Sequence, residues 1–196
     1  MSRVTACRRE DLPEFEEIFA GLEKAIGFIP GGLLVMGRNP AMLGAWLPLV
    51  RAVYHAESKV PAALKRLVAH TISREAGCAY SMAHTAHAAA DHGVPIEKIM
   101  AVFECATDPQ FTGAERAALS VARAAGSVPN GVDDDLFDTL GAHYSDDQVF
   151  EIIAVISLFG FLNRWQATLA LTLEEEPRQF AEKHLTEIGW TIGRHG

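Results

Sequence analysis

The sequence has few cysteines and fewer basic than acidic residues, and each scarcity excludes a class of protein. It holds three cysteines in 196 residues, at Cys7, Cys78 and Cys105, and their wide spacing fits neither a disulfide framework nor a zinc ribbon. Basic residues are fewer than acidic ones: the chain has 17 Lys and Arg and 25 Asp and Glu, which gives a formal net charge of −8. This balance argues against nucleic acid or an anionic membrane as a partner.

Long apolar runs are also missing. The start of the chain, MSRVTACRREDLPEFEE, is charged and mixed, so we expect no signal peptide. No run approaches the roughly 20 apolar residues of a membrane span. The most apolar run, residues 152–162, is too short for one, and we expect it to lie in a buried helix. With so few cysteines, we expect a cytoplasmic, reducing location and no membrane partner.

Strand patterns with a period of two are absent, whereas helical periodicity runs through the chain. Hydrophobic residues make up 49% of the sequence, enough for a packed core. We therefore predict an all-α fold in a single domain over residues 1–196, with N-terminal helices over 1–57 and a core over 58–196. Residues 64–86 and 148–170 can be laid side by side, which leaves open two degenerate helical halves.

Capping residues and apolar periods divide the chain into helices. We expect them over residues 11–25, 39–55, 61–76, 78–91, 96–102, 117–125, 133–140 and 147–173, with a last helix ending near 188. Phe28–Leu33 should be a break rich in Gly and Pro. Pro48 should kink or split its helix, and Pro177 should end the long one.

The chemistry is concentrated in residues 73–93, SREAGCAYSMAHTAHAAADHG. Gly77 is a natural helix stop, which places Cys78 in the first turn of a new helix. There the helix dipole and the free backbone N–H groups favour a thiolate. Ser81 and His84 follow at one-turn intervals near the same face, so a thiol, a hydroxyl and an imidazole could form a proton-relay site.

At these residues the chain resembles the carboxymuconolactone decarboxylase and alkyl hydroperoxidase D (AhpD-like) superfamily. The hallmark of that family is Cys-x-x-Cys followed by a His, at a helix start after a Gly. Cys78 matches the first cysteine, Tyr80 the aromatic residue before the second, and His84 the histidine. Residues 115–119, 158–168 and 189–195 also look like one branch of the family. The resemblance implies an AhpD-like multihelical bundle that assembles as a homo-oligomer (a dimer, trimer or hexamer).

Two positions depart from the family pattern. Ser81 stands where the second cysteine is expected, so no intramolecular Cys-x-x-Cys disulfide can form. The family glutamate of the preceding helix should lie near position 66, which is Arg66. Both departures weaken the transfer of peroxidase activity and leave the fold expectation intact.

The resemblance implies a thiol-dependent peroxidase with a single active-site cysteine and no bound cofactor or metal. Cys78 would attack a hydroperoxide and form a sulfenic acid, which an external thiol must then reduce. Ser81 would hydrogen-bond the thiolate, and His84 would carry the proton, with His87 able to serve instead.

Further residues are candidates for holding a small-molecule substrate. Arg74 on the preceding helix could hold an anionic substrate, and Asn163 and Arg164 are a polar pair in the most apolar helix, where burial without partners is costly. The full set of expected binding residues is His70, Arg74, Tyr80, Asn163, Arg164 and Trp165.

Three other interpretations remain open. In a decarboxylase acting on a carboxylated lactone, His70, His84 or His87 would be the acid or base, and Arg74 or Arg164 would clamp the carboxylate. The chain could instead be a degenerate, non-catalytic family member. A metal site is the weakest alternative, because the i, i+3, i+7 spacing of His84, His87 and Asp91 matches no strong metal signature.

Overall fold

The structure, a computed structural model, describes residues 2–55 and 57–196, and throughout these residues the regular elements are helices, with no strand. The α-helices are α1 (Glu16–Ile26), α2 (Gly31–Met36), α3 (Pro40–Val53), α4 (Ala62–Glu75), α5 (Ala79–Asp91), α6 (Ile96–Met100), α7 (Gly113–Gly126), α8 (Asp134–Gly141), α9 (Asp146–Leu169) and α10 (Glu175–His184). Short 3₁₀ turns lie at Arg9–Asp11, Pro13–Phe15, Ala101–Phe103, Thr186–Ile188 and Gly193–His195. The predicted all-α fold is confirmed.

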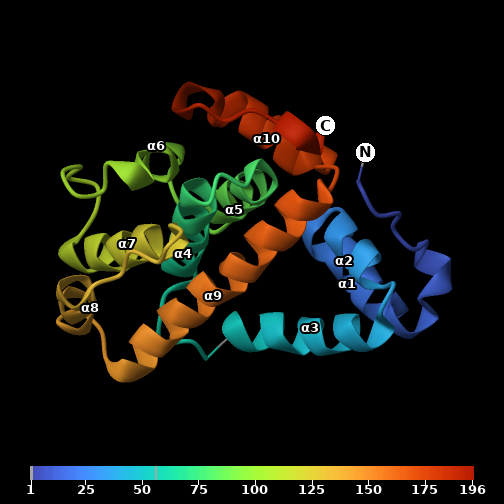
Figure 1. Cartoon of the computed structure of the whole chain (residues 1–196), viewed down its shortest axis with the longest axis horizontal. Helices are drawn as coiled ribbons and strands as arrows, with labels where there is room; N and C mark the ends of the chain where they lie inside the picture. The colour runs from blue at the N-terminus through green and yellow to red at the C-terminus, as the bar shows by residue number, and fades with distance from the viewer. Residues whose placement is uncertain (1, 56) are drawn as a thin grey trace.

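Helix α4 is the centre of the bundle and packs against α5, α7 and α9. Nine of its residues, from Leu64 to Ser73, are buried, so the helix is enclosed by its neighbours. Helix α9 crosses the molecule, and Figure 1 shows α3 diverging from it as the second arm of a V. Helix α10 covers α5, and the last residues of the chain return to α5 as well. This return brings the C-terminal segment to the start of α5, next to Cys78.

Three predicted helix starts are confirmed by their caps. The side chain of Asn39 accepts a hydrogen bond from the Met42 N–H at 3.1 Å. Thr112 with Glu115, and Ser145 with Gln148, form capping boxes at the starts of α7 and α9. Each cap satisfies backbone donors that the first turn of a helix leaves unpaired.

The structure corrects four boundaries. Helix α2 begins at Gly31, inside the break expected over residues 28–33, and runs to Met36. Helix α3 remains one element through Pro48, held by the buried side chains on either side of it. Helix α9 ends at Leu169, earlier than expected, because Ala170 adopts a left-handed conformation with φ 49°. Pro177 lies in the first turn of α10 rather than ending a helix, and a proline is tolerated there because its missing N–H would have no partner.

Helix α9 matches the predicted long apolar helix over residues 147–173, but it contradicts the expectation that the chain has no run of membrane-spanning length. It runs for 24 residues and is long and apolar enough, by length and composition alone, to cross a membrane. The central helix of a folded helical domain has the same character, and α9 packs against α3, α4, α5 and α7. Its outer side nevertheless leaves Phe150 73% exposed.

Candidate active site

Cys78 lies where the sequence predicts, at the junction of α4 and α5. Gly77 ends α4 with φ 63°, a conformation that glycine adopts without strain, and the chain then turns into α5. Cys78 is the N-cap residue of α5 and is 1% exposed. The first turn of the helix thus presents its backbone N–H groups to a buried sulfur atom.

The protonation state of Cys78 differs from the prediction. Burial raises the pKa of the thiol, and this effect outweighs the opposing effects of the Ser81 hydroxyl, the N–H groups of Ser81 and Tyr80, and the positive charge of Arg194. The expectation of a resting thiolate is therefore wrong. The helix dipole and the hydrogen bonds act in the expected direction, but they do not compensate for the loss of solvation. The resting site holds a neutral thiol.

The sulfur is linked to α9 through two side chains. The Ser81 oxygen lies 3.2 Å from the Cys78 sulfur, and the Ser81 hydroxyl also donates to the side-chain oxygen of Gln166 in a short hydrogen bond. A serine hydroxyl carries one hydrogen, so while it is donated to Gln166 the thiol can donate to Ser81. If the thiolate forms, the same hydroxyl can rotate to stabilise it. Gln166, a polar residue in an apolar helix, was not among the residues expected at the site.

A partly buried carboxylate, Glu174, contacts Gly31 and two residues of α5, Tyr80 and His84. It accepts hydrogen bonds from the Gly31 N–H at 2.6 Å and the Tyr80 hydroxyl at 2.8 Å. Its other oxygen lies 2.7 Å from Nε2 of His84. Burial alone would raise the pKa of Glu174, but the hydrogen bonds from His84, Gly31 and Tyr80 hold it below its ordinary value. The site therefore keeps a negative charge next to the imidazole.

Aromatic rings surround His84. Tyr80 stacks on it with ring centroids 4.5 Å apart, and Phe28 meets it edge-on at 5.6 Å. Burial and the charge of Glu174 raise the pKa of Tyr80 well above its usual value, so the phenol stays protonated. The negative charge of Cys78, when present, acts in the same direction, which puts the phenol within electrostatic reach of the sulfur. The predicted association of Cys78, Tyr80, Ser81 and His84 in one region agrees with this geometry.

The C-terminal segment closes the site. The indole N–H of Trp190 donates to the Ala79 carbonyl at 2.9 Å, which fixes the segment to the first residue of α5. The ring of His195 lies 5.7 Å from that of Tyr80, and its Nδ1 contacts the Leu171 carbonyl at 2.6 Å. Burial lowers the pKa of His195, so it adds no charge at neutral pH. Tertiary packing alone brings this segment to Cys78.

Two histidines that were expected at the site, His87 and His70, have other contacts than Cys78, Ser81 or Glu174. His87 packs on Phe180 of α10, with ring centroids 5.2 Å apart, and its Nε2 lies 3.8 Å from the carboxylate of Asp91 in its own helix. His70 is fully buried between helices, and its Nδ1 lies 3.1 Å from the Thr85 hydroxyl. Burial lowers the pKa of His70 to about 3, so it is neutral at physiological pH. This low pKa disfavours the acid role among the two roles, acid or base, that the decarboxylase alternative offers to His70.

Arg74 does not reach the thiol. Its guanidinium donates to the Met100 carbonyl at 2.9 Å and lies over the ring of Phe103 at 4.0 Å. It fastens the end of α4 to the turn after α6, which is a structural role. Arg66, at the expected place of the family glutamate, lies over the ring of Tyr54 at 4.1 Å. The carboxylate near the thiol is Glu174, supplied from more than 90 residues later in the chain.

The polar residues of α9 separate onto different sides of the helix. Asn163 is buried, and neither atom of its amide has a hydrogen-bond partner within residues 2–55 and 57–196. Arg164 and Trp165 instead line a cavity of about 820 Å³ that is not lined by Cys78, Ser81 or His84. This cavity is therefore distinct from the thiol site, although Arg164 and Trp165 were expected to bind the same substrate as the residues around Cys78.

Metal ligands do not converge in the part of the chain that the structure describes: no group of three His, Cys, Asp or Glu side chains is placed to hold a metal ion. His84 pairs with Glu174, whereas His87 pairs with Asp91. The alternative of a centre built from His84, His87 and Asp91 is thus wrong. What the site offers is a buried thiol beside a carboxylate, an imidazole and a phenol that can hold and transfer a proton.

Comparisons with known proteins agree with this geometry. The model of the carboxymuconolactone decarboxylase family matches residues 40–124. The debrominase Bmp8, solved as a cysteine-to-alanine variant with 2,3,4-tribromopyrrole, is 38% identical, with a TM-score of 0.84 over 92% of this chain and 96% of its own. Escherichia coli YnjA is 28% identical over 66% of this chain and 68% of its own length.

A more distant structure supports the fold alone. The AhpD core of a peroxidase-related protein from Ralstonia eutropha has a TM-score of 0.81 at 18% identity and covers 92% of this chain and 95% of its own. The sequence motif, the all-α bundle, the family match and the similarity to Bmp8 along nearly the whole chain lead to one assignment. This chain belongs to the carboxymuconolactone decarboxylase family, within the superfamily that includes the AhpD-like proteins.

Proposed function

We propose that this protein is a thiol-dependent reductase that removes a halogen from a halogenated aromatic compound. The observation that carries the proposal is the buried Cys78 thiol, 3.2 Å from the Ser81 hydroxyl, at the start of α5. The similarity to a debrominase, 38% over nearly the full chain, supports the class of substrate. The rings of Tyr80, His84 and Phe28 are suited to pack against a planar ring.

In the proposed reaction, the Cys78 thiolate bonds to the halogen while the carbon–halogen bond breaks. The ring carbon takes a proton, which leaves the reduced arene and a sulfenyl halide on Cys78. One external thiol then displaces halide and forms a mixed disulfide, and a second releases Cys78 as the thiol. Two external thiols thus supply the two electrons that the carbon gains. They are needed because Ser81 cannot act as a resolving thiol.

The proton for the ring carbon would come through His84. The imidazole is held by Glu174 at 2.7 Å and stacked on Tyr80 at 4.5 Å, which fixes its orientation. Deprotonation of Cys78 would accompany substrate binding, because the pKa of the buried thiol is raised in the resting protein. A substrate can reach the thiol only if the covering segment around Trp190 moves aside.

A hydroperoxidase is the second candidate, because a peroxide oxygen can take the place of the halogen at the same thiol. Cys78 would become a sulfenic acid while the peroxide leaves as an alcohol, and two external thiols would restore the cysteine with release of water. The similarity of fold to a peroxidase-related protein is compatible with this chemistry. Both candidates use Cys78 and His84 in the same roles.

We further propose that the protein acts as a homo-oligomer in a reducing compartment. The apolar groove between α3 and α9 supports association, because Leu49 and Phe150 expose large hydrophobic surfaces beside it. Light scattering on the purified chain, compared with a Phe150→Glu variant, tests this proposal. A monomeric wild-type protein at micromolar concentration would contradict it.

The test of the main proposal measures bromide release from brominated pyrroles, including 2,3,4-tribromopyrrole, with dithiothreitol as the thiol. We expect release by the wild-type protein and by Cys105→Ala, a control that removes another buried thiol. Cys78→Ala should abolish release. His84→Gln and Glu174→Gln should each slow it by about 10²-fold or more, the usual effect of losing a general acid.

Parallel assays separate the candidates. Consumption of tert-butyl hydroperoxide without bromide release would replace the first candidate by the second. Turnover of a carboxylated muconolactone that persists in Cys78→Ala would indicate a decarboxylase instead. If none of the three substrates is turned over by the wild-type protein, the chain is a non-catalytic member of its family.

A further inference from the structure

A cavity of about 820 Å³ lies on the side of α9 facing away from Gln166, the residue that reaches the thiol site. Residues 157, 161, 164 and 168 of α9 line it at intervals of three and four, so they share one face of the helix. Gln166 is half a turn away and accepts a hydrogen bond from Ser81. The cavity and the thiol are therefore separated by the width of one helix.

The cavity has the size and lining of a ligand site. Its volume of about 820 Å³ lies in the range of about 300 to 1,000 Å³ typical of small-molecule pockets. Phe161 and Trp165 are nearly parallel on one edge of α9, with ring centroids 5.8 Å apart and planes 17° apart. These rings offer a flat apolar surface to a ligand.

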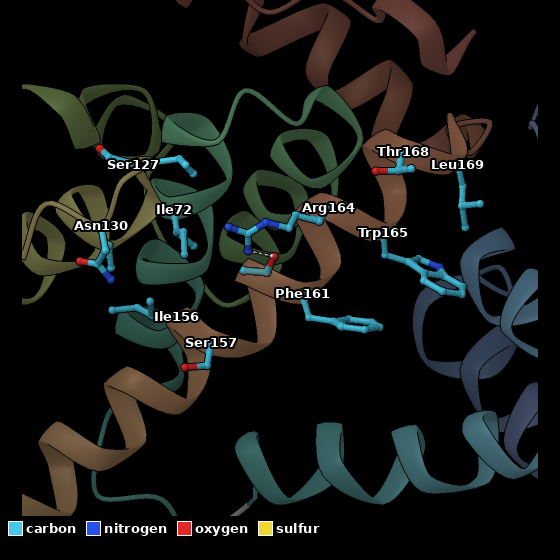
Figure 2. Close-up of a pocket in the computed structure, with 13 residues that line it drawn as sticks. Ile72, Ser127, Asn130, Ile156, Ser157, Phe161, Arg164, Trp165, Thr168 and Leu169 are labelled. Carbon is cyan, nitrogen blue, oxygen red and sulfur yellow. Dashed lines mark hydrogen bonds between the residues drawn. The ribbon is translucent and has the colours of Figure 1, made fainter.

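Figure 2 shows how the polar and apolar residues divide. The side chain of Arg164 extends on the side of Ile72 and Asn130, whereas the rings of Phe161 and Trp165 project from the opposite edge of the helix. The loop after α7 adds the hydroxyl of Ser127 and the amide of Asn130 to the polar end. A ligand lying across α9 would meet a cationic end and an apolar end.

The charge at the polar end is positive, although the chain as a whole is acidic. Arg164 is the charged member of the lining, and its guanidinium donates to the Gly160 carbonyl of its own helix at 3.2 Å. The carboxylate that accepts from Ser127 is Glu75, which is already paired with Arg123 at 3.3 Å. The Arg164 guanidinium can therefore offer its remaining donors to an anion.

We propose that this cavity binds a small amphipathic carboxylate, with the carboxylate on Arg164 and the apolar body against Phe161 and Trp165. A planar guanidinium can bind a carboxylate through two parallel hydrogen bonds, and the ring pair excludes water from the other end. This site is separate from the Cys78 site and does not depend on the proposed reduction. It would bind its ligand whether or not the thiol is reactive.

Titration calorimetry with a matched pair of probes tests this inference. We expect 2-naphthoate to bind wild-type protein at least tenfold more tightly than 2-naphthamide, which has the same rings without the charge. Arg164→Gln should remove that difference, because the loss of one charge-assisted contact corresponds to about tenfold or more in affinity. Phe161→Ala should weaken both probes.

Two controls locate the effect. Arg51→Gln removes an exposed arginine of α3 that does not line the cavity and should leave binding unchanged. Cys78→Ala should also bind 2-naphthoate as the wild-type protein does, because the thiol lies on the other side of α9. Equal binding of the two probes, or no effect of Arg164→Gln, would overturn the proposal.

The proposal would also be overturned if neither probe binds and light scattering shows a stable oligomer that Arg164→Gln or Phe161→Ala dissociates. In that case the face of α9 would be covered by a second copy of the chain rather than by a small molecule.

Discussion

The Ser81 hydroxyl lies 3.2 Å from the Cys78 sulfur, at the position where the hallmark of the family has a second cysteine. The two side chains therefore occupy the places of a Cys-x-x-Cys pair. The hydroxyl can stabilise a thiolate but cannot form a disulfide. This one replacement decides how an oxidised Cys78 is restored.

Ser81→Cys should give the site a disulfide. The side chains already approach closely at the first turn of α5, so mild oxidation should link Cys78 to the new thiol with little movement of the backbone. Thiol titration should show the loss of two thiols in Ser81→Cys and no such loss in the wild-type protein. The double variant Cys78→Ala, Ser81→Cys is the matched control. If both thiols of Ser81→Cys stay titratable after oxidation, the side chains at positions 78 and 81 are not close enough to form a disulfide.

Alkylation of Cys78 should be slow at neutral pH and accelerate only at alkaline pH. Burial raises the pKa of the thiol, and the thiolate is the nucleophile. Ser81→Ala removes a hydrogen bond that lowers this pKa, so alkylation should slow further, by about tenfold for each pKa unit. Mass spectrometry of iodoacetamide-treated protein measures the rates, with the urea-unfolded chain as reference. A folded-state pKa below that of the unfolded chain would contradict the assignment of a neutral resting thiol.

Lys65→Met should destabilise the fold by about 1.5 to 3 kcal/mol, the usual worth of a hydrogen bond to a charged group, because Glu151 keeps its hydrogen bonds from Ser58 and the Lys59 N–H. Lys65 is 2% exposed and lies 2.9 Å from Glu151, and its ammonium also donates to the Val53 carbonyl at 2.7 Å. Urea unfolding measures the loss.

Lys59→Met is the matched control for that measurement, because it removes an exposed lysine whose pair with Asp147 is solvated. Its effect should stay within about 1 kcal/mol. The double variant Lys65→Met, Glu151→Leu should regain part of the stability, since no unpaired charge remains. Equal losses in the free energy of unfolding for the two lysine variants would show that the Lys65–Glu151 pair stabilises the fold no more than the exposed Lys59–Asp147 pair does.

Stability should fall as the pH drops from about 6.5 towards 3. The pKa of His70 is lowered from 6.5 to about 3 by burial, so in this interval the unfolded chain binds a proton that the folded protein does not. The stability is fully present above 6.5, and the slope is at most about 1.4 kcal/mol per pH unit for each such histidine. His195, whose pKa burial also lowers, adds in the same direction.

Urea unfolding at a series of pH values tests this dependence. His70→Gln should flatten the slope between pH 4.5 and 6.5, whatever it does to the absolute stability. His92→Gln, a change at an exposed histidine, should keep the wild-type slope. An unchanged slope in His70→Gln would mean that His70 is protonated in the folded protein.

The sequence by itself determined the all-α class, several helix starts and the position of the thiol. Local signals suffice for these, because the Asn39 cap, the capping boxes of Thr112 and Ser145 and the Gly77 stop each act within one or two turns of the backbone. The spacing of Cys78, Ser81 and His84 along one helix likewise follows from its period.

Only the tertiary structure decided which distant groups surround that helix. Glu174 and Gln166 lie 90 and 85 residues away from their partners His84 and Ser81, and no local pattern links them. Packing also set the protonation states, because desolvation depends on what covers a residue. It made Cys78 a neutral thiol and His70 a neutral imidazole, where the sequence had favoured a thiolate and a candidate acid.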